Sequence, residues 1–211
     1  MTNKNVSGLV VRDAVSDGWG VPPLLYMAGR MTVQPDWRNE WRPKTLPDAG
    51  ILDSDIPPVD VKVGRHKFRY TGPFGDDMSN HSFLHGNDGA MSSGEQTIFR
   101  RSLCSIQLAD IVMARIDLPK IECHGTLAEI GYACGIGKAI YLMLVVDDLD
   151  THHWNDIVVH RDPLEAGNHE AWFAIGMARR CITVSKFNVP AGVSLLADFA
   201  IADRVRVIQK R

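Results

Sequence analysis

Residues 139–146 form an uninterrupted apolar run, Ala-Ile-Tyr-Leu-Met-Leu-Val-Val, which restricts the possible folds more than any other segment of the sequence. The run is far too short to cross a lipid bilayer as a helix. It is instead typical of a strand that is buried on both faces. Strands of this kind occur in parallel sheets that are covered by helices on both sides. We therefore expect an α/β protein with a strand at residues 138–146.

Other short apolar runs alternate with helix-like segments along the chain. The expected strands are residues 24–28, 59–70, 111–116, 138–146 and 181–185. The expected helices are residues 94–108, 126–136, 168–180 and 192–203. This alternation predicts a doubly wound α/β fold, in which helices cover both faces of a parallel sheet.

The length of 211 residues and the hydrophobic content of 45% fit one domain with a sizeable core. We expect an N-terminal arm at residues 1–21 and a domain at residues 22–211, with long loops at 32–58 and 72–94. The second loop is rich in Gly, Asp, Asn and Ser, and loops of that length are usually functional or disordered.

The charge and cysteine content limit the partners and the location. A net charge of −2 suggests neither a nucleic-acid nor a membrane-surface partner. The N-terminal residues lack the basic start and apolar core of a signal peptide. The four cysteines have no close-paired spacing and apolar neighbours, so we expect reduced, mostly buried thiols in a soluble, cytoplasmic protein.

One carboxylate stands out in the middle of the chain. In the stretch Ile121-Glu-Cys-His-Gly-Thr-Leu-Ala-Glu-Ile-Gly-Tyr-Ala133, Glu129 lies in a small and apolar helix start that follows a strand-like run. Open α/β sheets bind ligands at the carboxyl ends of their strands, which favours a ligand-facing role for Glu129. The spacing Thr126-x-x-Glu129 also fits a capping box, in which both side chains only stabilise the helix start.

Several motifs surround this carboxylate in a fixed order. They are Leu24-Leu-Tyr-Met-Ala-Gly-Arg-Met31, Tyr70-Thr-Gly-Pro-Phe74, Ala109-Asp-Ile-Val112, Gly125-Thr-x-x-Glu-Ile-Gly-Tyr-Ala133 and Gly137-Lys138. Over roughly residues 22 to 185, this order resembles the nucleoside 2-deoxyribosyltransferase family and its relatives that hydrolyse N-glycosidic bonds of nucleotides. The resemblance implies a flavodoxin-like, five-stranded parallel sheet and a homo-oligomer. It also implies a nucleoside or nucleotide substrate and a free nucleobase as partners.

The resemblance assigns catalytic roles to two residues. Glu129 matches the nucleophile that attacks the anomeric carbon, and Tyr26 matches the tyrosine that orients it. Cleavage of an N-glycosidic bond builds positive charge on the sugar, which a carboxylate can stabilise and trap covalently. The departing base also needs a proton from a nearby acid.

The chain departs from the family pattern at two positions. Cys123 stands where the family often has an Asp, which leaves the proton donor open among Asp117, Glu122 and Asp88. We favour Asp117 because it lies just beyond a strand end. Arg30 stands where the transferases commonly carry a Pro. It could bind a 5′-phosphate or form a surface salt bridge.

Further substrate contacts are expected around these residues. They are Gly29, which allows close backbone approach, the aromatic Phe74, His85 and Asp88 in the long loop, Gly125 and Thr126 at the helix start, and Asn168. The spacing of His81 and His85 near acidic residues is compatible with a metal site, but no further ligand follows at a suitable spacing. We expect no metal and no cofactor, since the glycine patterns of dinucleotide folds and P-loops are missing.

Three functions remain open at this point. The first is a deoxyribosyltransferase that works through a glycosyl-Glu129 intermediate. The second is a nucleoside 5′-monophosphate N-glycosidase, which Arg30 and Cys123 favour. The third is a sensor that binds a nucleotide without turnover, because a fold alone does not fix function.

Overall fold

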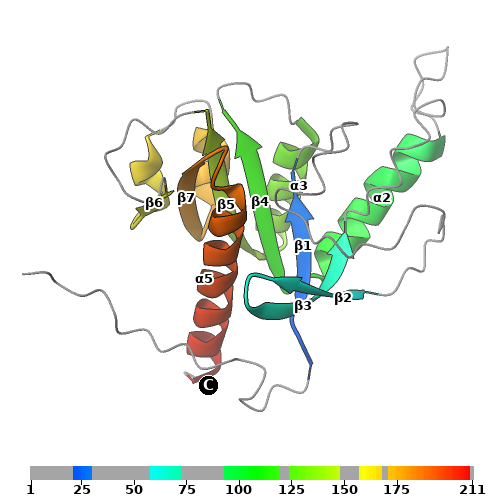
Figure 1. Cartoon of the computed structure of the whole chain (residues 1–211). Coiled ribbons are helices and arrows are strands. Elements are labelled where there is room, and N and C mark those ends of the chain that lie inside the picture. Colours follow the sequence, from blue (N-terminus) through cyan, green and yellow to red (C-terminus); the bar gives the residue numbers. More distant parts are fainter. Residues whose placement is uncertain are drawn as a thin grey trace, which may run out of the picture.

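The computed structural model describes residues 21–29, 58–72, 93–118, 124–147, 157–167 and 171–209. The strands are β1 (Leu24–Ala28), β2 (Val59–Val63), β3 (His66–Gly72), β4 (Ile111–Asp117), β5 (Ala139–Val146), β6 (Ile157–His160) and β7 (Arg180–Ser185). The helices are α2 (Ser93–Leu108), α3 (His124–Gly135), the 3-10 helix η3 (Pro163–Ala166), α4 (Trp172–Met177) and α5 (Val189–Gln209). Figure 1 shows how these elements are arranged.

The strands form a seven-stranded sheet in the order β2-β3-β1-β4-β5-β7-β6. The inner strands β3, β1, β4, β5 and β7 pair in parallel, whereas β2 and β6 pair antiparallel at the two edges. The parallel strands have the flavodoxin-like order, so the expected doubly wound α/β fold is confirmed. The expected count of five strands holds for the parallel part alone, because two short antiparallel strands extend its edges.

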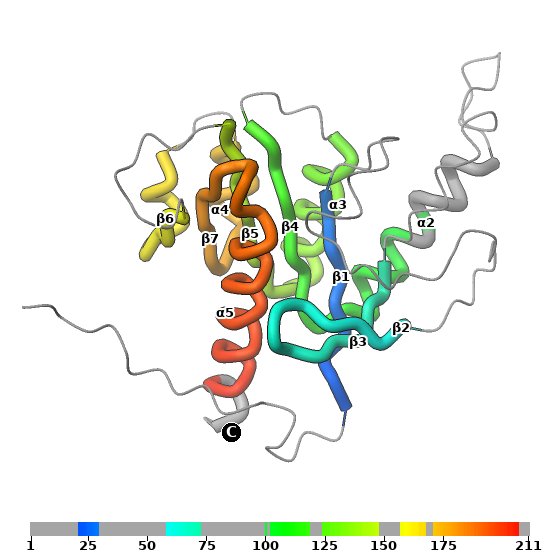
Figure 2. The backbone as a smooth tube through the Cα atoms, in the orientation of Figure 1, coloured from blue at the N-terminus to red at the C-terminus, as the bar shows by residue number. Residues whose placement is uncertain are grey.

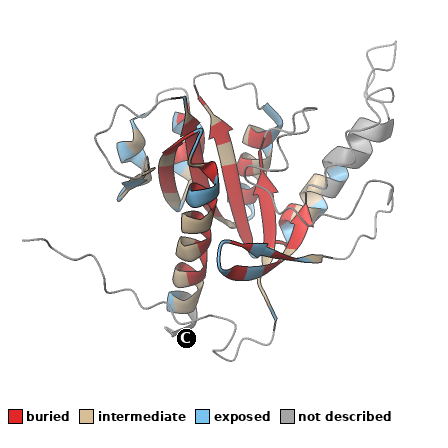
Figure 3. Ribbon diagram, viewed as in Figure 1, coloured by how far each residue is buried: buried red, intermediate tan, exposed pale blue. Residues whose placement is uncertain are grey.

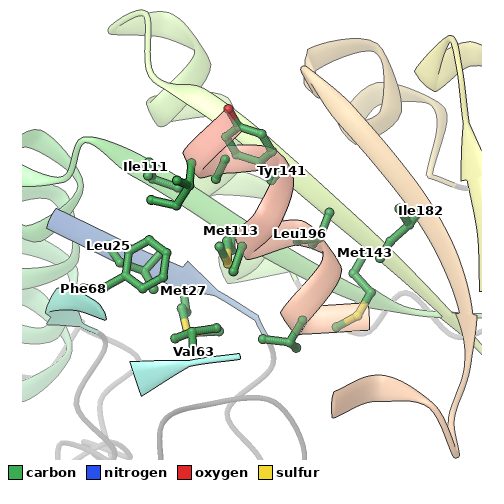
Figure 4. Close-up of a cluster of buried hydrophobic side chains, with 14 of the residues drawn as sticks. Leu25, Met27, Val63, Phe68, Ile111, Met113, Tyr141, Met143, Ile182 and Leu196 are labelled. Carbon is green, nitrogen blue, oxygen red and sulfur yellow. The ribbon is translucent and has the colours of Figure 1, made fainter. Parts of the chain in front are cut away.

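Helices cover both faces of this sheet, as Figure 2 shows. On one face α5 packs over a core that includes Met113, Met143 and Leu196 (Figure 4). On the other face α2, α3 and α4 enclose a second core, to which Ile106 and Ile130 belong. Figure 3 shows that β4 and β5 are buried along almost their whole length. The apolar run at residues 139–146 is therefore the doubly buried strand that its sequence predicted.

The segment at residues 59–70 is a hairpin and not the single strand that we expected. Val63 pairs with His66, so only Gly64 and Arg65 form the loop between β2 and β3. Gly64 has φ of 58°, a conformation that glycine adopts readily and that two-residue hairpin loops require. The alternating pattern of the sequence continued through this turn, which is why the pattern alone suggested one strand. The hairpin is tied to α5 by Asp198, whose Oδ1 lies 2.6 Å from His66 Nε2.

Three further boundaries differ from the expected ones. The helix expected at residues 168–180 is shorter, because α4 ends at Met177. Ala178 already has an extended backbone, and the Arg179 N–H donates to Ile140 O at 2.8 Å. The chain therefore leaves the helix and joins the sheet at this point. At the C-terminal end α5 is longer than expected, since Pro190 occupies its first turn, where proline is tolerated. The short edge strand β6 was not expected at all.

The described cysteines differ in their exposure. Cys181 is buried, but Cys104 and Cys134 are exposed, so the expectation of mostly buried thiols is wrong for those two. Among the described residues, no helix combines the length and the apolar character that crossing a membrane demands. Apart from Val21, the N-terminal arm lies outside the described residues, and so do the loops at 32–58 and 72–94 except at their ends.

Gly192 in the first turn of α5 generates a stability prediction. A Cβ atom at this position would lie 2.8 Å from Val184 Cγ1 and 2.9 Å from Met143 Sδ, so the helix or these two side chains would have to shift. We expect Gly192→Ala to lower the free energy of unfolding by about 1–3 kcal/mol, measured by urea denaturation. The matched control is Gly131→Ala in α3, where a Cβ meets no described atom within 4 Å. That variant should be unchanged or up to about 1 kcal/mol more stable. Equal stability of the two variants would contradict the close packing of α5.

Candidate active site

The strand order reverses between β1 and β4. From β1 the chain continues to β3 on one side, whereas from β4 it continues through α3 to β5 on the other side. The connections after these two strands therefore diverge at the carboxyl edge of the sheet, toward which both arrows point in Figure 1. Such a divergence leaves a crevice where open α/β sheets bind their ligands. The fold thus places the candidate site beside β1 and β4.

A short hydrogen bond joins β1 to the helix that follows β4. The hydroxyl of Tyr26, in β1, donates to Oε1 of Glu129, in α3, at 2.6 Å. The side chain of Tyr26 is completely buried and belongs to the core under α3. Tyr26 and Glu129 are 103 residues apart in the sequence, so the sheet and the helix layer must both form before they can meet.

The apolar face of α3 fixes the position of Glu129. Thr126, Ile130 and Ala133 are the buried residues of α3, at the spacing of one helix face. Glu129 lies beside this face and is partly exposed, so its carboxylate reaches β1 from the flank of the helix. The helix begins at His124, which puts Thr126 inside the first turn and not at the capping position. A capping box therefore does not account for Glu129, whose carboxylate accepts a hydrogen bond from Tyr26 in β1.

Burial determines the protonation state of the tyrosine. Loss of solvent raises the pKa of Tyr26 well above its ordinary value, and the negative charge of Glu129 raises it further. Tyr26 is thus a neutral phenol that donates its proton to the carboxylate at every physiological pH. A donor held in this way orients one carboxylate oxygen and stabilises its charge.

Ser102, on α2, was not among the expected site residues. Its side chain acts to lower the pKa of Tyr26, against the larger raising effects of burial and of Glu129. Its only signal in the sequence is the spacing of four residues from Ile106, which is buried in the core below α2 and α3. A serine at this spacing is common in helices, so the pattern alone could not distinguish it.

The structure does not bring Asp117 together with Glu129. Ile116 and Leu118 belong to the core under α3. Because side chains alternate along a strand, Asp117 points to the opposite, α5-covered face. Its Oδ1 accepts from Arg115 Nε at 2.7 Å. The Asp117 side chain and the Tyr26–Glu129 pair therefore lie on opposite faces of the sheet.

The remaining expected site residues divide into two groups. Gly29 is buried directly after β1, and Thr126 is buried in the first turn of α3. Gly125 is exposed, and a Cβ there would meet no described atom within 4 Å. The others lie outside the described residues, namely Arg30, Phe74, His85, Asp88 and Asn168. Within the described ranges no three His, Cys, Asp or Glu side chains are grouped so that they could hold a metal ion.

The fold and the site together define a class of protein. It is a flavodoxin-like α/β protein with a tyrosine-bound carboxylate beside the point where the strand order reverses. The family model described as nucleoside 2-deoxyribosyltransferase matches residues 62–189, more than half of the chain, and the chain belongs to this family. No curated protein sequence matches the chain. The matched range contains Glu129 but not β1, so the pairing with Tyr26 is known from the structure and not from the family match.

Removal of the tyrosine hydroxyl tests the geometry of the pair. We expect Tyr26→Phe to lower kcat for the reaction proposed below by about 10- to 100-fold, since a hydrogen bond to a charged group contributes about 1.5–3 kcal/mol. KM should change little, because the shape of the pocket is kept. Steady-state kinetics on the variant and the wild type provide the measurement. A raised KM with unchanged kcat would place Tyr26 in substrate binding instead.

Proposed function

We propose that this protein cleaves the N-glycosidic bond of (deoxy)nucleosides and transfers the sugar to another base, with Glu129 as the nucleophile. The observation that carries the proposal is the hydrogen bond of 2.6 Å between Tyr26 and Glu129 at the carboxyl edge of the sheet. Membership of the nucleoside 2-deoxyribosyltransferase family supports the general reaction class.

The reaction proceeds in two displacements. A Glu129 carboxylate oxygen bonds to C1′ of the sugar while the bond from C1′ to the base nitrogen breaks, and its electron pair leaves with the base. The departing base takes up a proton from an acid of the site. A nitrogen of the incoming base then attacks C1′ of the glycosyl ester and releases the carboxylate, while the proton of that nitrogen returns to the acid. Two inversions at C1′ give net retention of configuration.

Tyr26 contributes by holding the nucleophile in place. Its neutral hydroxyl fixes Oε1 of Glu129, which limits the carboxylate to a narrow range of orientations. Restriction of a reacting group to a productive orientation lowers the entropic part of the barrier. Burial raises the pKa of Tyr26 well above its ordinary value, so the hydroxyl stays protonated. No phenolate is therefore present to act as a base beside Glu129.

The acid that protonates the leaving base is one of three carboxyl groups. Asp117, Glu122 and Asp88 are the candidates from the sequence. The Asp117 side chain is directed to the α5 face, opposite the Tyr26–Glu129 pair, which disfavours it. We therefore propose Glu122 or Asp88 in this role.

Replacement of the nucleophile tests the proposal directly. Glu129→Gln keeps an acceptor for Tyr26 but lacks the charged oxygen, so base exchange should fall by at least about a thousandfold. The assay incubates the protein with a deoxynucleoside and a different free base, and chromatography detects the exchanged nucleoside. Mass spectrometry should find a deoxyribosyl adduct on the Glu129 peptide of the wild type alone.

Glu165→Ala is the matched control for this experiment. Glu165 is an exposed glutamate in η3, outside the candidate site, and its removal should leave exchange unchanged. Near-full exchange in Glu129→Gln would overturn the assignment of the nucleophile. Binding of nucleosides without any turnover in the wild type would instead support the sensor hypothesis.

A second candidate function is the hydrolysis of nucleoside 5′-monophosphates. The sequence feature that favours it is Arg30, which follows Gly29 just after β1. If a phosphate binds there, Arg30→Ala should lose about 1.5–3 kcal/mol in kcat/KM with the nucleotide and nothing with the matching nucleoside. Parallel kinetics on the two substrates give the answer. An equal and weak response to both would assign Arg30 to the surface and leave transfer as the better function.

A further inference from the structure

The pairing of β1 with β3 is interrupted directly beside Tyr26. Leu25 pairs with Tyr70. The next residue of β1, Tyr26, pairs with Gly72, so Thr71 is an extra residue on β3. On its other side β1 pairs with β4 in a regular register from Leu25 onward. An extra residue of this kind is a β-bulge, which bends its strand and redirects nearby side chains, and bulges are frequent beside active sites but rare in parallel pairs.

The hydroxyl group of Thr71 spans this interruption. It donates to the carbonyl oxygen of Leu25 at 3.1 Å, in a buried hydrogen bond. Thr71 itself is buried, with 5% of its surface exposed. The accepting carbonyl belongs to the peptide group that joins Leu25 to Tyr26, so this bond holds the backbone where the tyrosine side chain leaves the strand. Threonine also has few side-chain rotamers, which keeps its hydroxyl in one place.

The bulge ends at Gly72, which lies close to the tyrosine ring. Gly72 has φ of 137°, a conformation that residues with a side chain rarely adopt. A Cβ atom at this position would lie 3.6 Å from Cε2 of Tyr26 and 3.4 Å from Oγ of Ser105, on α2. The ring of Tyr26 therefore lies close to the backbone of β3, with α2 beside it. Thr71 and Gly72 together restrict the backbone and the ring of the same tyrosine.

We propose that Thr71 is a positioning residue for the hydroxyl of Tyr26 and, through it, for the carboxylate of Glu129. The inference rests on the proposed function, in which that carboxylate is the nucleophile. The tyrosine hydroxyl is at the far end of a long and rigid side chain, so a small rotation of the backbone beside Thr71 moves it much further than it moves Cα. Its hydrogen bond to Glu129 is short, at 2.6 Å, and depends on distance and angle. A misplacement of about 1 Å in a catalytic group can lower a rate about a hundredfold.

A kinetic double-mutant cycle tests the inference. Thr71→Val keeps the branched shape but has no hydroxyl, so kcat should fall about two- to tenfold, the size expected for one neutral hydrogen bond, with KM changed less than about twofold. Thr71→Ser keeps the hydroxyl and should recover most of the wild-type kcat. Thr71→Cys, whose thiol is a weaker donor, should lie between the two. In the Tyr26→Phe background Thr71→Val should have almost no further effect on kcat, because the hydroxyl that it displaces is already missing.

Thr183→Val is the matched control. Thr183 is also a strand threonine with a hydrogen-bonded hydroxyl, 2.9 Å from His160 Nε2, but it lies in β7, which β4 and β5 separate from β1. Its replacement should leave kcat unchanged. An unchanged kcat in Thr71→Val would overturn the inference, as would an equal loss in the wild-type and Tyr26→Phe backgrounds.

A measurement without substrate separates this inference from the proposed function. The chain has four tyrosines, so protein labelled with carbon-13 at the tyrosine Cζ gives four NMR signals, and the one missing in Tyr26→Phe belongs to Tyr26. Because its chemical shift depends on the hydrogen bond to Glu129, that signal should move in Thr71→Val and keep its wild-type position in Thr71→Ser and Thr183→Val. A moved signal in a protein whose wild type exchanges no bases would refute the proposed function and support the positioning of Tyr26 by Thr71. An unmoved signal in Thr71→Val would overturn the inference whether or not the protein is active.

Discussion

Burial of both faces of the parallel strands is the constraint from which the other features of this protein follow. Side chains of β4 and β5 alternate between the core under α5 and the core under α3, so neither face can be left to water. The helix α3 must therefore turn Ile130 and Ala133 toward the sheet. Once that face is fixed, the carboxylate of Glu129 has a defined place beside β1. Hydrophobic packing thus sets the position of the polar group, and the hydrogen bond from Tyr26 refines its orientation.

The sequence predicted those features that depend on local pattern. The apolar runs located β1, β4, β5 and β7 to within one or two residues. Pattern failed where a single residue changed the direction of the chain, as Gly64 does in the hairpin between β2 and β3. It also failed for α4, which ends early because Arg179, directly before β7, bonds to Ile140. These outcomes depend on tertiary contacts that no short window of sequence contains.

In the candidate site, too, the sequence predicted some residues, while the placement of others depends on tertiary contacts. Resemblance to a family suggested Tyr26 and Glu129 as partners, and the structure brings them within hydrogen-bond distance. Asp117 was chosen for its place after a strand end, but the direction of a side chain depends on strand alternation, which turns it toward α5. The influence of Ser102 on the pKa of Tyr26 could not be found from the sequence, since it depends on how α2 lies against β1. The motif residue Lys138 has a structural explanation in its two bonds to the end of α2.

The central place of β1 in the sheet has a consequence for how the chain folds during synthesis. Although it precedes every other described strand in the sequence, β1 lies between β3 and β4, and its pairs reach from Leu25 to Ile111. Contacts between distant parts of a chain form slowly, and proteins are made from the N-terminus onward. One edge of β1 therefore stays unpaired until the ribosome has delivered β4, and Tyr26 stays without its acceptor until α3 follows. The first described strand to leave the ribosome thus gains its second partner only after β2, β3 and α2 have been made.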